Sequence, residues 1–534
     1  MALLGLTSLA FADTYPRQPG IDALHYVFRV VVTDGSNEIA GETTVTLKAM
    51  ADGVRDIELD LISAVSGKGM TVTAVTRQAA GVSSALAFTH QSDRLRVSLP
   101  APVNKGAEVS FTVTYTGVPG EGLRLIDNIH GERVVFSENW PNRARQWLPT
   151  IDHPYDKATG EFVVTAPAQY QVVANGLLVE ERDLPDRRRL THWKQSVPIA
   201  SWLYALGIAR FAVHHAGVVK GVELQTWSFP QDRDTSLRIF EDLSRRAMTF
   251  FVEQIGPYPY EKIANVQAAG MSGGTEHASA IFYGEKGVAA GRAPVVHEIA
   301  HQWWGNAVTE HDWDDVWLSE GFATYFTLLF TEHDEGRDAF VRGLQLSRTR
   351  VLELETKLPD APIVHRNLAD MQRVLNRLIY EKGAWVLHML RAEIGTEAFW
   401  QGIRDYYRRY RDRNASTPDL RDMMEQVSGK PLDWFFTQWL TRSGIPRVEG
   451  TWRYDAARKM VDVTVSQTQA ADPYRLTVEV GVAGTAGASP RVDRVELTGR
   501  QATVSVPAET EPAAVTLDPG TWMLMDAGPL TRVQ

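Results

Sequence analysis

One short stretch constrains the fold of this chain more than any other. It is the sequence His-Glu-x-x-His at residues 297–301, followed after eighteen further residues by Glu320. Residues four positions apart lie on one face of a helix, so a helix here directs His297 and His301 to one point. Glu298, between them, can reach a water molecule at that point without binding a metal itself. The pattern predicts two successive helices that supply three ligands to a metal ion and leave one coordination position open.

The ligand types favour zinc in a catalytic rather than a structural site. Two neutral imidazoles and one carboxylate leave a position for water, which then ionises at about pH 7. Glu298 is placed to take a proton from that water as a general base. The sequence contains no cysteine, which excludes thiolate ligands, disulfides and a cysteine nucleophile. An amphipathic core helix with two histidines would not explain the acidic residue that follows. We therefore predict one catalytic Zn²⁺ held by His297, His301 and Glu320.

Length and charge limit the class of protein. A chain of 534 residues is too long for one hydrophobic core and suggests about three domains. Its formal net charge of −10 provides no basic face for nucleic acid or for an anionic membrane. The sequence contains no apolar run of about eighteen residues, so we expect no membrane-spanning helix.

The first twelve residues resemble the end of a secretory signal peptide. A short apolar stretch covers residues 2–9, and Ala10, Phe11 and Ala12 form a small-x-small cleavage signature before Asp13. The positively charged region that usually comes first is missing, which also fits a clipped start or a disordered apolar tail. We expect a signal peptide at residues 1–12 and a periplasmic or secreted protein.

Hydrophobic periodicity divides the rest of the chain into three regions. Alternation of apolar and polar residues predicts a β-rich N-terminal domain over residues 13–215. Alternation in the last ninety residues predicts a small β-sandwich domain over 446–534. Helical spacing dominates between them and predicts a mainly helical domain over 216–445, with helices near 292–306, 317–333, 370–392, 395–411 and 417–427. The expected fold class is multidomain α+β.

Several segments together resemble one known family. HEIAHQWWGN at 297–306, WLSEGFA at 317–323 and YEKG at 380–383 are similar to sequences of the aminopeptidase N family of zinc metallopeptidases, gluzincins that include leukotriene hydrolase. GGTEH at 273–277 stands where that family has its Gly-x-Met-Glu-Asn exopeptidase motif, and the segment that begins at Glu138 resembles its N-terminal signature. The resemblance keeps the family's order from about residue 25 to 445.

The resemblance implies a thermolysin-like catalytic domain and assigns further site residues. Tyr380 would donate a hydrogen bond to the tetrahedral oxyanion. Glu276 and Glu138 would hold the free α-ammonium group of a peptide substrate by charge-assisted hydrogen bonds. Gly273 and Gly274 would let an extended substrate approach the backbone and pair with it as an added strand.

Two departures from the family pattern bear on specificity. Thr275 and His277 replace the usual Met and Asn of the exopeptidase motif, although the Glu remains. The chain ends after the small β domain, so we expect a short form without the large C-terminal helical domain of many relatives. That domain helps to roof the substrate cavity, and selection for short peptides is therefore an open question.

These observations favour a zinc aminopeptidase that acts on peptides with a free N-terminus. A zinc endopeptidase is an alternative, but burying the carboxylates of Glu138 and Glu276 without a substrate amine would be costly. A non-catalytic peptide-binding protein on the same fold is a second alternative. It is disfavoured because Glu298 and Tyr380, which folding does not need, are both present. The sequence leaves the preferred side chain, the physiological substrate and the oligomeric state open.

Two other polar groups are predicted to have no role in the site. His214 and His215 are expected at a surface or strand end rather than in a second metal site. Asp312, Asp314 and Asp315 lack the spacing of a calcium loop, and we predict a solvated turn there.

Overall fold

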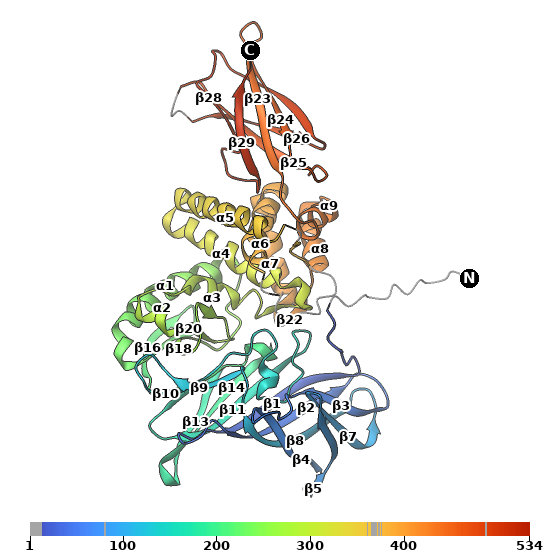
Figure 1. Cartoon of the computed structure of the whole chain (residues 1–534), viewed down its shortest axis with the longest axis vertical. Coiled ribbons are helices and arrows are strands. Elements are labelled where there is room, and N and C mark those ends of the chain that lie inside the picture. Colours follow the sequence, from blue (N-terminus) through green and yellow to red (C-terminus); the bar gives the residue numbers. More distant parts are fainter. Residues whose placement is uncertain are drawn as a thin grey trace, which may run out of the picture. The chain divides into compact units, whose positions relative to one another are not determined.

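The computed structural model describes residues 13–79, 82–359, 361–364, 371, 374, 376–485 and 489–533, which form two compact units (Figure 1). Unit 1 contains the described residues up to Asp315, with Met371 and Arg404–Ser416. Unit 2 contains the other described residues from Val316 onward. The expected signal peptide, residues 1–12, and the start of the helix predicted at 370–392 lie outside the described residues.

A sheet of eight strands dominates the first 200 residues, in the order β13-β14-β11-β1-β2-β8-β4-β5. Buried residues alternate with less buried ones along its central strands, as in a sheet with one face on the core. Phe28 is opposite Phe162 on the neighbouring parallel strand, with ring centres 5.0 Å apart. The strands are β1 Ile21–Val31, β2 Ile39–Ala49, β4 Gly69–Ala79, β5 Val82–Ala85, β8 Glu108–Val118, β11 Lys157–Pro167, β13 Leu177–Leu184 and β14 Arg188–Ala200.

Two smaller sheets complete this region, and together they confirm the predicted β-rich N-terminal domain. One has the order β3-β7-β6 and the other the order β12-β15-β10-β9. Their strands are β3 Val54–Asp60, β6 Ala87–Gln91, β7 Arg94–Val103, β9 Leu123–Asp127, β10 Arg133–Ser137, β12 Gln171–Ala174 and β15 Leu206–Ala209.

A five-stranded sheet follows in unit 1, where the sequence pattern predicts mainly helix. Its order is β16-β17-β18-β20-β19, and β17, β18 and β20 run parallel. Every residue of β18 and β20 is buried, so these strands show no alternation to reveal them. Phe240 of the long helix α1 packs on Tyr283 of β20, with ring centres 4.8 Å apart. The elements are β16 Ala212–Val219, β17 Val222–Ser228, α1 Arg233–Gln254, β18 Lys262–Ala268, β19 Gly274–Thr275, β20 Ala280–Gly284 and α2 Glu285–Ala289.

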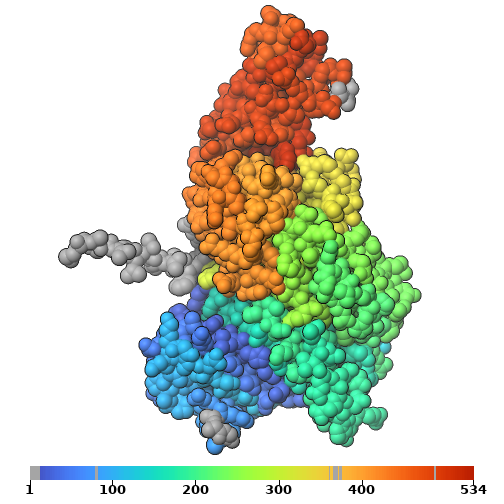
Figure 2. Space-filling model, turned by 180° about the vertical axis from the view of Figure 1, so that it is seen from behind, coloured from blue at the N-terminus to red at the C-terminus, as the bar shows by residue number. Residues whose placement is uncertain are grey.

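The helix of the His-Glu-x-x-His motif, α3 Val295–His301, is shorter than predicted. After it the chain turns at Gly305, whose φ of 94° favours glycine, and enters β21 Val308–Glu310. β21 runs parallel to β22 Arg413–Ala415, which also belongs to unit 1. In the space-filling view the N-terminal strands, blue to teal, and the green segment that follows them form one continuous surface (Figure 2).

Helices build the first part of unit 2 and agree with the predicted helical region. An ideal Cβ added to Gly321 of α4 would lie 3.0 Å from the Cα of Gly383 of α6, so the two helices approach closely at these glycines. Both glycines come from the motifs WLSEGFA and YEKG. The helices are α4 Trp317–Glu335, α5 Arg337–Lys357, α6 Leu378–Ile394, α7 Thr396–Tyr410, α8 Thr417–Ser428 and α9 Asp433–Phe436; α7 passes into unit 1 at Arg404.

Seven strands follow the helices in unit 2 and form two sheets, of orders β27-β24-β23-β29 and β26-β25-β28. The loop before β29 contacts α6, because Trp522 stacks on His388 with ring centres 4.8 Å apart. Among the described residues no helix is long and apolar enough to cross a membrane. The strands are β23 Arg447–Asp455, β24 Met460–Gln467, β25 Leu476–Ala483, β26 Arg491–Leu497, β27 Gln501–Pro507, β28 Ala514–Leu517 and β29 Asp526–Arg532.

Candidate active site

The two histidines of α3 converge as a shared metal ion would require. Their Nε2 atoms are 3.1 Å apart. A tetrahedral zinc ion with Zn–N distances of about 2.0–2.1 Å separates two ligand nitrogens by about 3.3 Å, so His297 and His301 fit this ion. His301 Nδ1 lies 3.1 Å from the carbonyl oxygen of Trp304. Because a carbonyl only accepts, Nδ1 carries the proton and Nε2 keeps its lone pair for a metal.

The short length of α3 gives His301 this carbonyl partner. The turn after His301 brings the Trp304 carbonyl back to the imidazole, which a continued helix would not do. Trp303 anchors the turn, since its ring packs 5.6 Å from Phe251 and 5.4 Å from Tyr258. The helix was predicted to reach residue 306 but ends at the second histidine. This earlier end lets the Trp304 carbonyl accept a hydrogen bond from His301.

Glu276 is held beside α3 by two side chains for which the sequence predicts no role. Its backbone carbonyl accepts hydrogen bonds from Gln302 Nε2 at 3.0 Å and from Asn306 Nδ2 at 2.6 Å. The carboxylates of Glu276 and Glu298 and a ring nitrogen of His301 all lie within 4.8 Å of one another, and all three residues are buried. Gln302 and Asn306 belong to the motif HEIAHQWWGN, but only the fold shows that both donate to the backbone carbonyl of Glu276.

The glycine pair before Glu276 has a steric reason. An ideal Cβ on Gly274 would lie 2.5 Å from three atoms of the Glu298 side chain, including Oε1. Only glycine therefore lets the backbone come this close to the proposed base. Gly273 has a φ of 74°, which also favours glycine. Gly274 lies on β19, an edge strand of the five-stranded sheet.

The two residues that depart from the exopeptidase motif are buried. His277 is fully buried and packs edge-on against Phe282, with ring centres 4.9 Å apart. Burial lowers the pKa of the His277 imidazole to about 4, so it is a neutral core group at pH 7. Thr275 pairs with Phe282 in the register of β19 and β20.

Glu138 already has cationic partners in unit 1. Arg143 forms a short ion pair with its carboxylate, and Arg124 Nη2 lies 3.5 Å from Oε2. Burial raises the pKa of the Glu138 carboxyl, while the two arginines act in the opposite direction. The carboxylate is therefore neither a solvated loop group nor an isolated anion.

Unit 2 brings Glu320 and Tyr380 together. Tyr380 Oη donates a hydrogen bond of 2.7 Å to Glu320 Oε1. The close approach of Gly321 and Gly383, each next to or near one of these residues in sequence, sets the spacing of their helices. Roles were predicted for both side chains, but the hydrogen bond between them was not predicted.

Of the two polar groups predicted to lie outside the site, one has the expected surroundings and the other does not. His214 and His215 lie on β16 and form surface pairs with Glu241 and Glu223, as expected. The predicted solvated turn at 312–315 is wrong, because Asp312 is only 6% exposed and Asp314 only 2%.

Sequence profiles of two domains match this chain. That of the Peptidase family M1 domain matches residues 242–439, and that of the Peptidase M1 N-terminal domain matches residues 22–203. The chain is 27% identical to human glutamyl aminopeptidase over 368 residues, which are 64% of this chain and 38% of that protein. It is 26% identical to aminopeptidase N of Streptomyces lividans over 445 residues, 75% of this chain and 50% of that protein. The chain thus spans about a third to a half of these relatives.

Solved structures also match, and the match covers nearly all of their chains. A crystal structure of an M1 zinc metallopeptidase from Deinococcus radiodurans superposes with a TM-score of 0.68 and 26% identity, covering 80% of this chain and 95% of that one. A mutant of the same protein, bound to a Tyr-Ser-Ala substrate, gives a TM-score of 0.65 at 25% identity, covering 79% of this chain and 94% of that one.

Proposed function

Because the chain belongs to the M1 family of zinc metallopeptidases, we propose that it is a zinc-dependent aminopeptidase, which removes N-terminal residues from peptides. One observation carries the proposal. The Nε2 atoms of His297 and His301 converge to 3.1 Å, and the carboxylates of Glu298 and Glu276 lie within 4.8 Å of a ring nitrogen of His301. A metal-binding pair, a base and an anion for a substrate amine are thus within a few ångströms of one another.

The family implies one catalytic zinc ion, and we assign His297, His301 and Glu320 as its ligands. The two histidines support this assignment by their spacing and by the tautomer that Trp304 imposes. When bound, zinc lowers the pKa of a coordinated water and polarises the carbonyl of the peptide bond. Glu320 is the family's third ligand by its place in WLSEGFA.

We assign the proton transfers to Glu298. It is buried on α3 between the two histidines, where its carboxylate can accept a proton from the attacking water. The same carboxyl then delivers the proton to the leaving amine, so one group serves both steps. Tyr380 would donate its hydroxyl proton in a hydrogen bond to the oxyanion. Because the hydroxyl has a single proton, it would have to leave Glu320 Oε1, its acceptor in this structure, to do so.

Glu276 is the stronger of two candidates for the substrate's α-ammonium group. Gln302 and Asn306 fix its backbone, and burial strengthens its attraction for a cation. Glu138 is the weaker candidate because Arg143 and Arg124 already compensate its charge. β19 is an edge strand, so Gly273 and Gly274 leave room for an extended peptide to add to the sheet.

Hydrolysis of matched peptides tests this proposal. Purified protein is assayed on a panel of aminoacyl-aminomethylcoumarins and on the same compounds with an acetylated N-terminus. Cleavage of the free amines alone supports an aminopeptidase. Equal cleavage of the acetylated compounds would instead support the endopeptidase, and zinc binding without any cleavage would support a peptide-binding protein. Glu276→Gln should raise KM for the free amines more than it lowers kcat.

We also propose that the protein is exported. The support is the sequence of residues 1–12, which ends in a small-x-small cleavage signature. N-terminal sequencing of the mature protein from periplasmic or culture fractions should begin at Asp13. A cytoplasmic product that retains residues 1–12 would contradict export.

We also propose a β-sandwich architecture for residues 446–534, supported by the two sheets that their strands form.

A further inference from the structure

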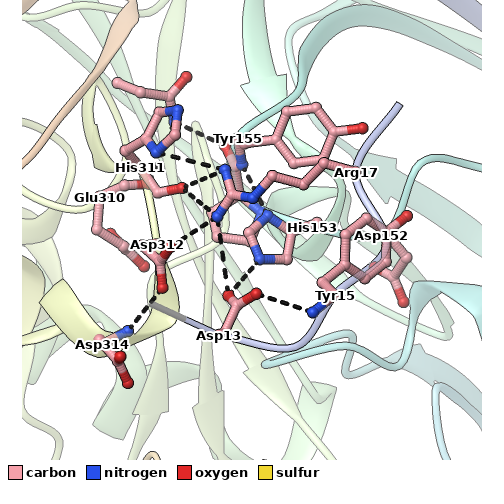
Figure 3. Close-up of polar contacts among 12 residues, drawn as sticks. Asp13, Tyr15, Arg17, Asp152, His153, Tyr155, Glu310, His311, Asp312 and Asp314 are labelled. Atoms are coloured by element: carbon pink, nitrogen blue, oxygen red, sulfur yellow. Dashed lines mark hydrogen bonds and ion pairs between the residues drawn. The ribbon is translucent and has the colours of Figure 1, made fainter. Parts of the chain in front are cut away.

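Residues 13–17, which we call the N-terminal strap, are tied to the rest of unit 1 by polar contacts of Asp13, Tyr15 and Arg17, although Thr14 and Pro16 are exposed. Asp13 is 5% exposed, and its Oδ2 lies 2.6 Å from His153 Nε2, which is buried as well (Figure 3). The backbone amide of Tyr15 donates to the other carboxylate oxygen of Asp13 at 3.0 Å. The start of the described chain is therefore fixed by a buried polar contact with a residue about 140 positions away.

Tyr15 joins the strap to the N-terminal domain. Its hydroxyl donates a hydrogen bond of 2.6 Å to Asp60, and its ring stacks on His153 with centres 4.6 Å apart. The guanidinium of Arg94 lies 5.2 Å from the same ring. These contacts involve a hydroxyl, two ring faces and a cation, and they hold the strap in one position.

Arg17 joins the strap to the segment 310–315, which we call the lead loop. Its Nη2 donates to Asp312 Oδ2 at 2.7 Å, and its Nη1 lies 3.3 Å from His311 Nδ1. The guanidinium also lies 5.1 Å from the centre of the Tyr155 ring. Figure 3 shows Arg17 reaching the lead loop between the side chains of His153 and Tyr155. The side chain is 7% exposed, so these charge-assisted contacts are shielded from water.

The lead loop depends on this cation. Asp312 is buried, and its Oδ1 accepts the backbone amide of Asp314 at 3.3 Å while its Oδ2 accepts Arg17. A buried carboxylate without a cation would be costly, so loss of Arg17 would favour a different loop conformation. Trp313 completes the packing, with its ring 5.5 Å from that of Trp140 and 6.3 Å from that of Trp202.

Two parts of the proposed site are continuous with this loop. Asp315 is followed directly by α4, whose first turn contains Glu320, five residues later. Trp140, which packs on Trp313, donates its backbone amide to Glu138. The position of the lead loop thus constrains the start of the helix with the assigned third ligand. It also constrains the segment around Trp140, which contains the candidate substrate-binding residue Glu138.

We propose that Arg17 is a positioning residue, through which the N-terminal strap fixes the lead loop and hence the start of α4, the helix with the assigned zinc ligand Glu320. The inference rests on the proposed zinc assignment but adds a group that touches neither metal nor substrate. It makes residues 13–17 part of the support of the active site.

Substitution of Arg17 tests this role. Arg17→Met keeps the length and apolar stem but removes the charge and donors, and Arg17→Lys keeps the charge. We expect Arg17→Met to weaken zinc affinity about tenfold in competition with a chromophoric chelator. At saturating zinc kcat should fall severalfold while KM changes less than twofold, and Arg17→Lys should restore part of both losses. Arg29→Met is the matched control, because Arg29 forms a half-exposed pair with Glu42 at 3.3 Å in the same domain.

Further outcomes separate the possibilities. Wild-type zinc affinity and kcat in Arg17→Met, with only a lower melting temperature, would overturn the proposal. If that variant does not fold, Asp312→Asn supplies the test, because the amide keeps the shape while it removes the buried charge that Arg17 compensates. Unchanged zinc affinity and kcat there would also overturn it. If wild type binds zinc but cleaves no free amine, the proposed function fails, while the zinc-affinity comparison still decides the role of Arg17.

Discussion

At the scale of single residues, the site depends on the position of one side chain, Glu298, and on the small size of another residue, Gly274. Glu298 must reach the attacking water, and Gly274 must leave it room, since a Cβ there would lie 2.5 Å from the Glu298 side chain. The carbonyl of Trp304 fixes the tautomer of His301, so the lone pair that binds metal is set by the fold and not by chance.

Glu298→Gln should separate metal binding from chemistry. The amide keeps the size of the side chain but cannot accept the proton of the attacking water, so we expect kcat to fall by about 10²–10⁴-fold. Zinc content, measured on the purified protein, should equal that of wild type because Glu298 is not an assigned ligand. A variant with full activity would remove Glu298 from the mechanism.

Gly274→Ala should damage catalysis through crowding. The added methyl group must displace the carboxylate of Glu298, and a shift of about 1 Å can cost about 100-fold in rate. Zinc affinity should change little. Gly35→Ala is the control, since an added Cβ there meets no atom within 4 Å. Equal steady-state kinetics for the two variants would show that the close approach of Gly274 has no catalytic consequence.

At the scale of elements, the helices α4 and α6 of unit 2 carry side chains that hydrogen-bond to each other. α4 and α6 touch at Gly321 and Gly383, and the Tyr380–Glu320 hydrogen bond joins the same two helices. His388, farther along α6, accepts the hydroxyl of Tyr325 on α4 at 3.1 Å and donates to the carbonyl of Thr521 at 2.9 Å. One neutral imidazole thus joins both helices to the loop before β29.

His388→Gln should weaken the pH dependence of stability. Burial lowers the pKa of His388 to about 3, and protonation would break the bond from Tyr325. An unfolded histidine binds a proton below about pH 6.5. As pH falls from 6.5 toward 3, the unfolded state therefore gains the proton first, and stability falls by about 1.4 kcal/mol per pH unit for this group.

Melting temperatures between pH 7 and 5 measure this effect. The difference between wild type and His388→Gln should be largest at pH 7 and should shrink as the solution becomes more acidic. His215→Gln serves as the matched comparison, since it removes an exposed histidine that pairs with Glu223 and leaves the buried imidazole of His388 in place. Parallel profiles for wild type and His388→Gln would contradict the role assigned to this imidazole.

At the scale of the whole molecule, removal of zinc should affect both activity and stability. Chelation should abolish hydrolysis, and Zn²⁺ but not Mg²⁺ should restore it. A ligand that binds only the folded state at about 1,000 times its Kd stabilises by about 4 kcal/mol, so the melting temperature should rise on zinc addition. Glu298→Gln should keep this rise and Glu320→Ala should lose it. Chelator-resistant activity would contradict the zinc mechanism.

Features that depend on local sequence spacing were predictable. Helical spacing predicted α4, α7 and α8 to within a few residues, and alternation predicted the β-rich N-terminal domain. The five-stranded sheet was missed because β18 and β20 are buried on both faces and lack alternation. The burial of Asp312 was missed because its partner, Arg17, is 295 positions away.

The order of amino acids was sufficient to identify the family, the zinc motif and the residue types needed for the chemistry, because each motif consists of residues close together in the chain. Which groups support these residues follows from the three-dimensional fold. It placed Gln302 and Asn306 on the carbonyl of Glu276, Gly274 against Glu298, and Arg17 on Asp312. Such contacts depend on where distant segments meet, and no spacing along the chain encodes the shielding from water that gives a buried ion pair its effect.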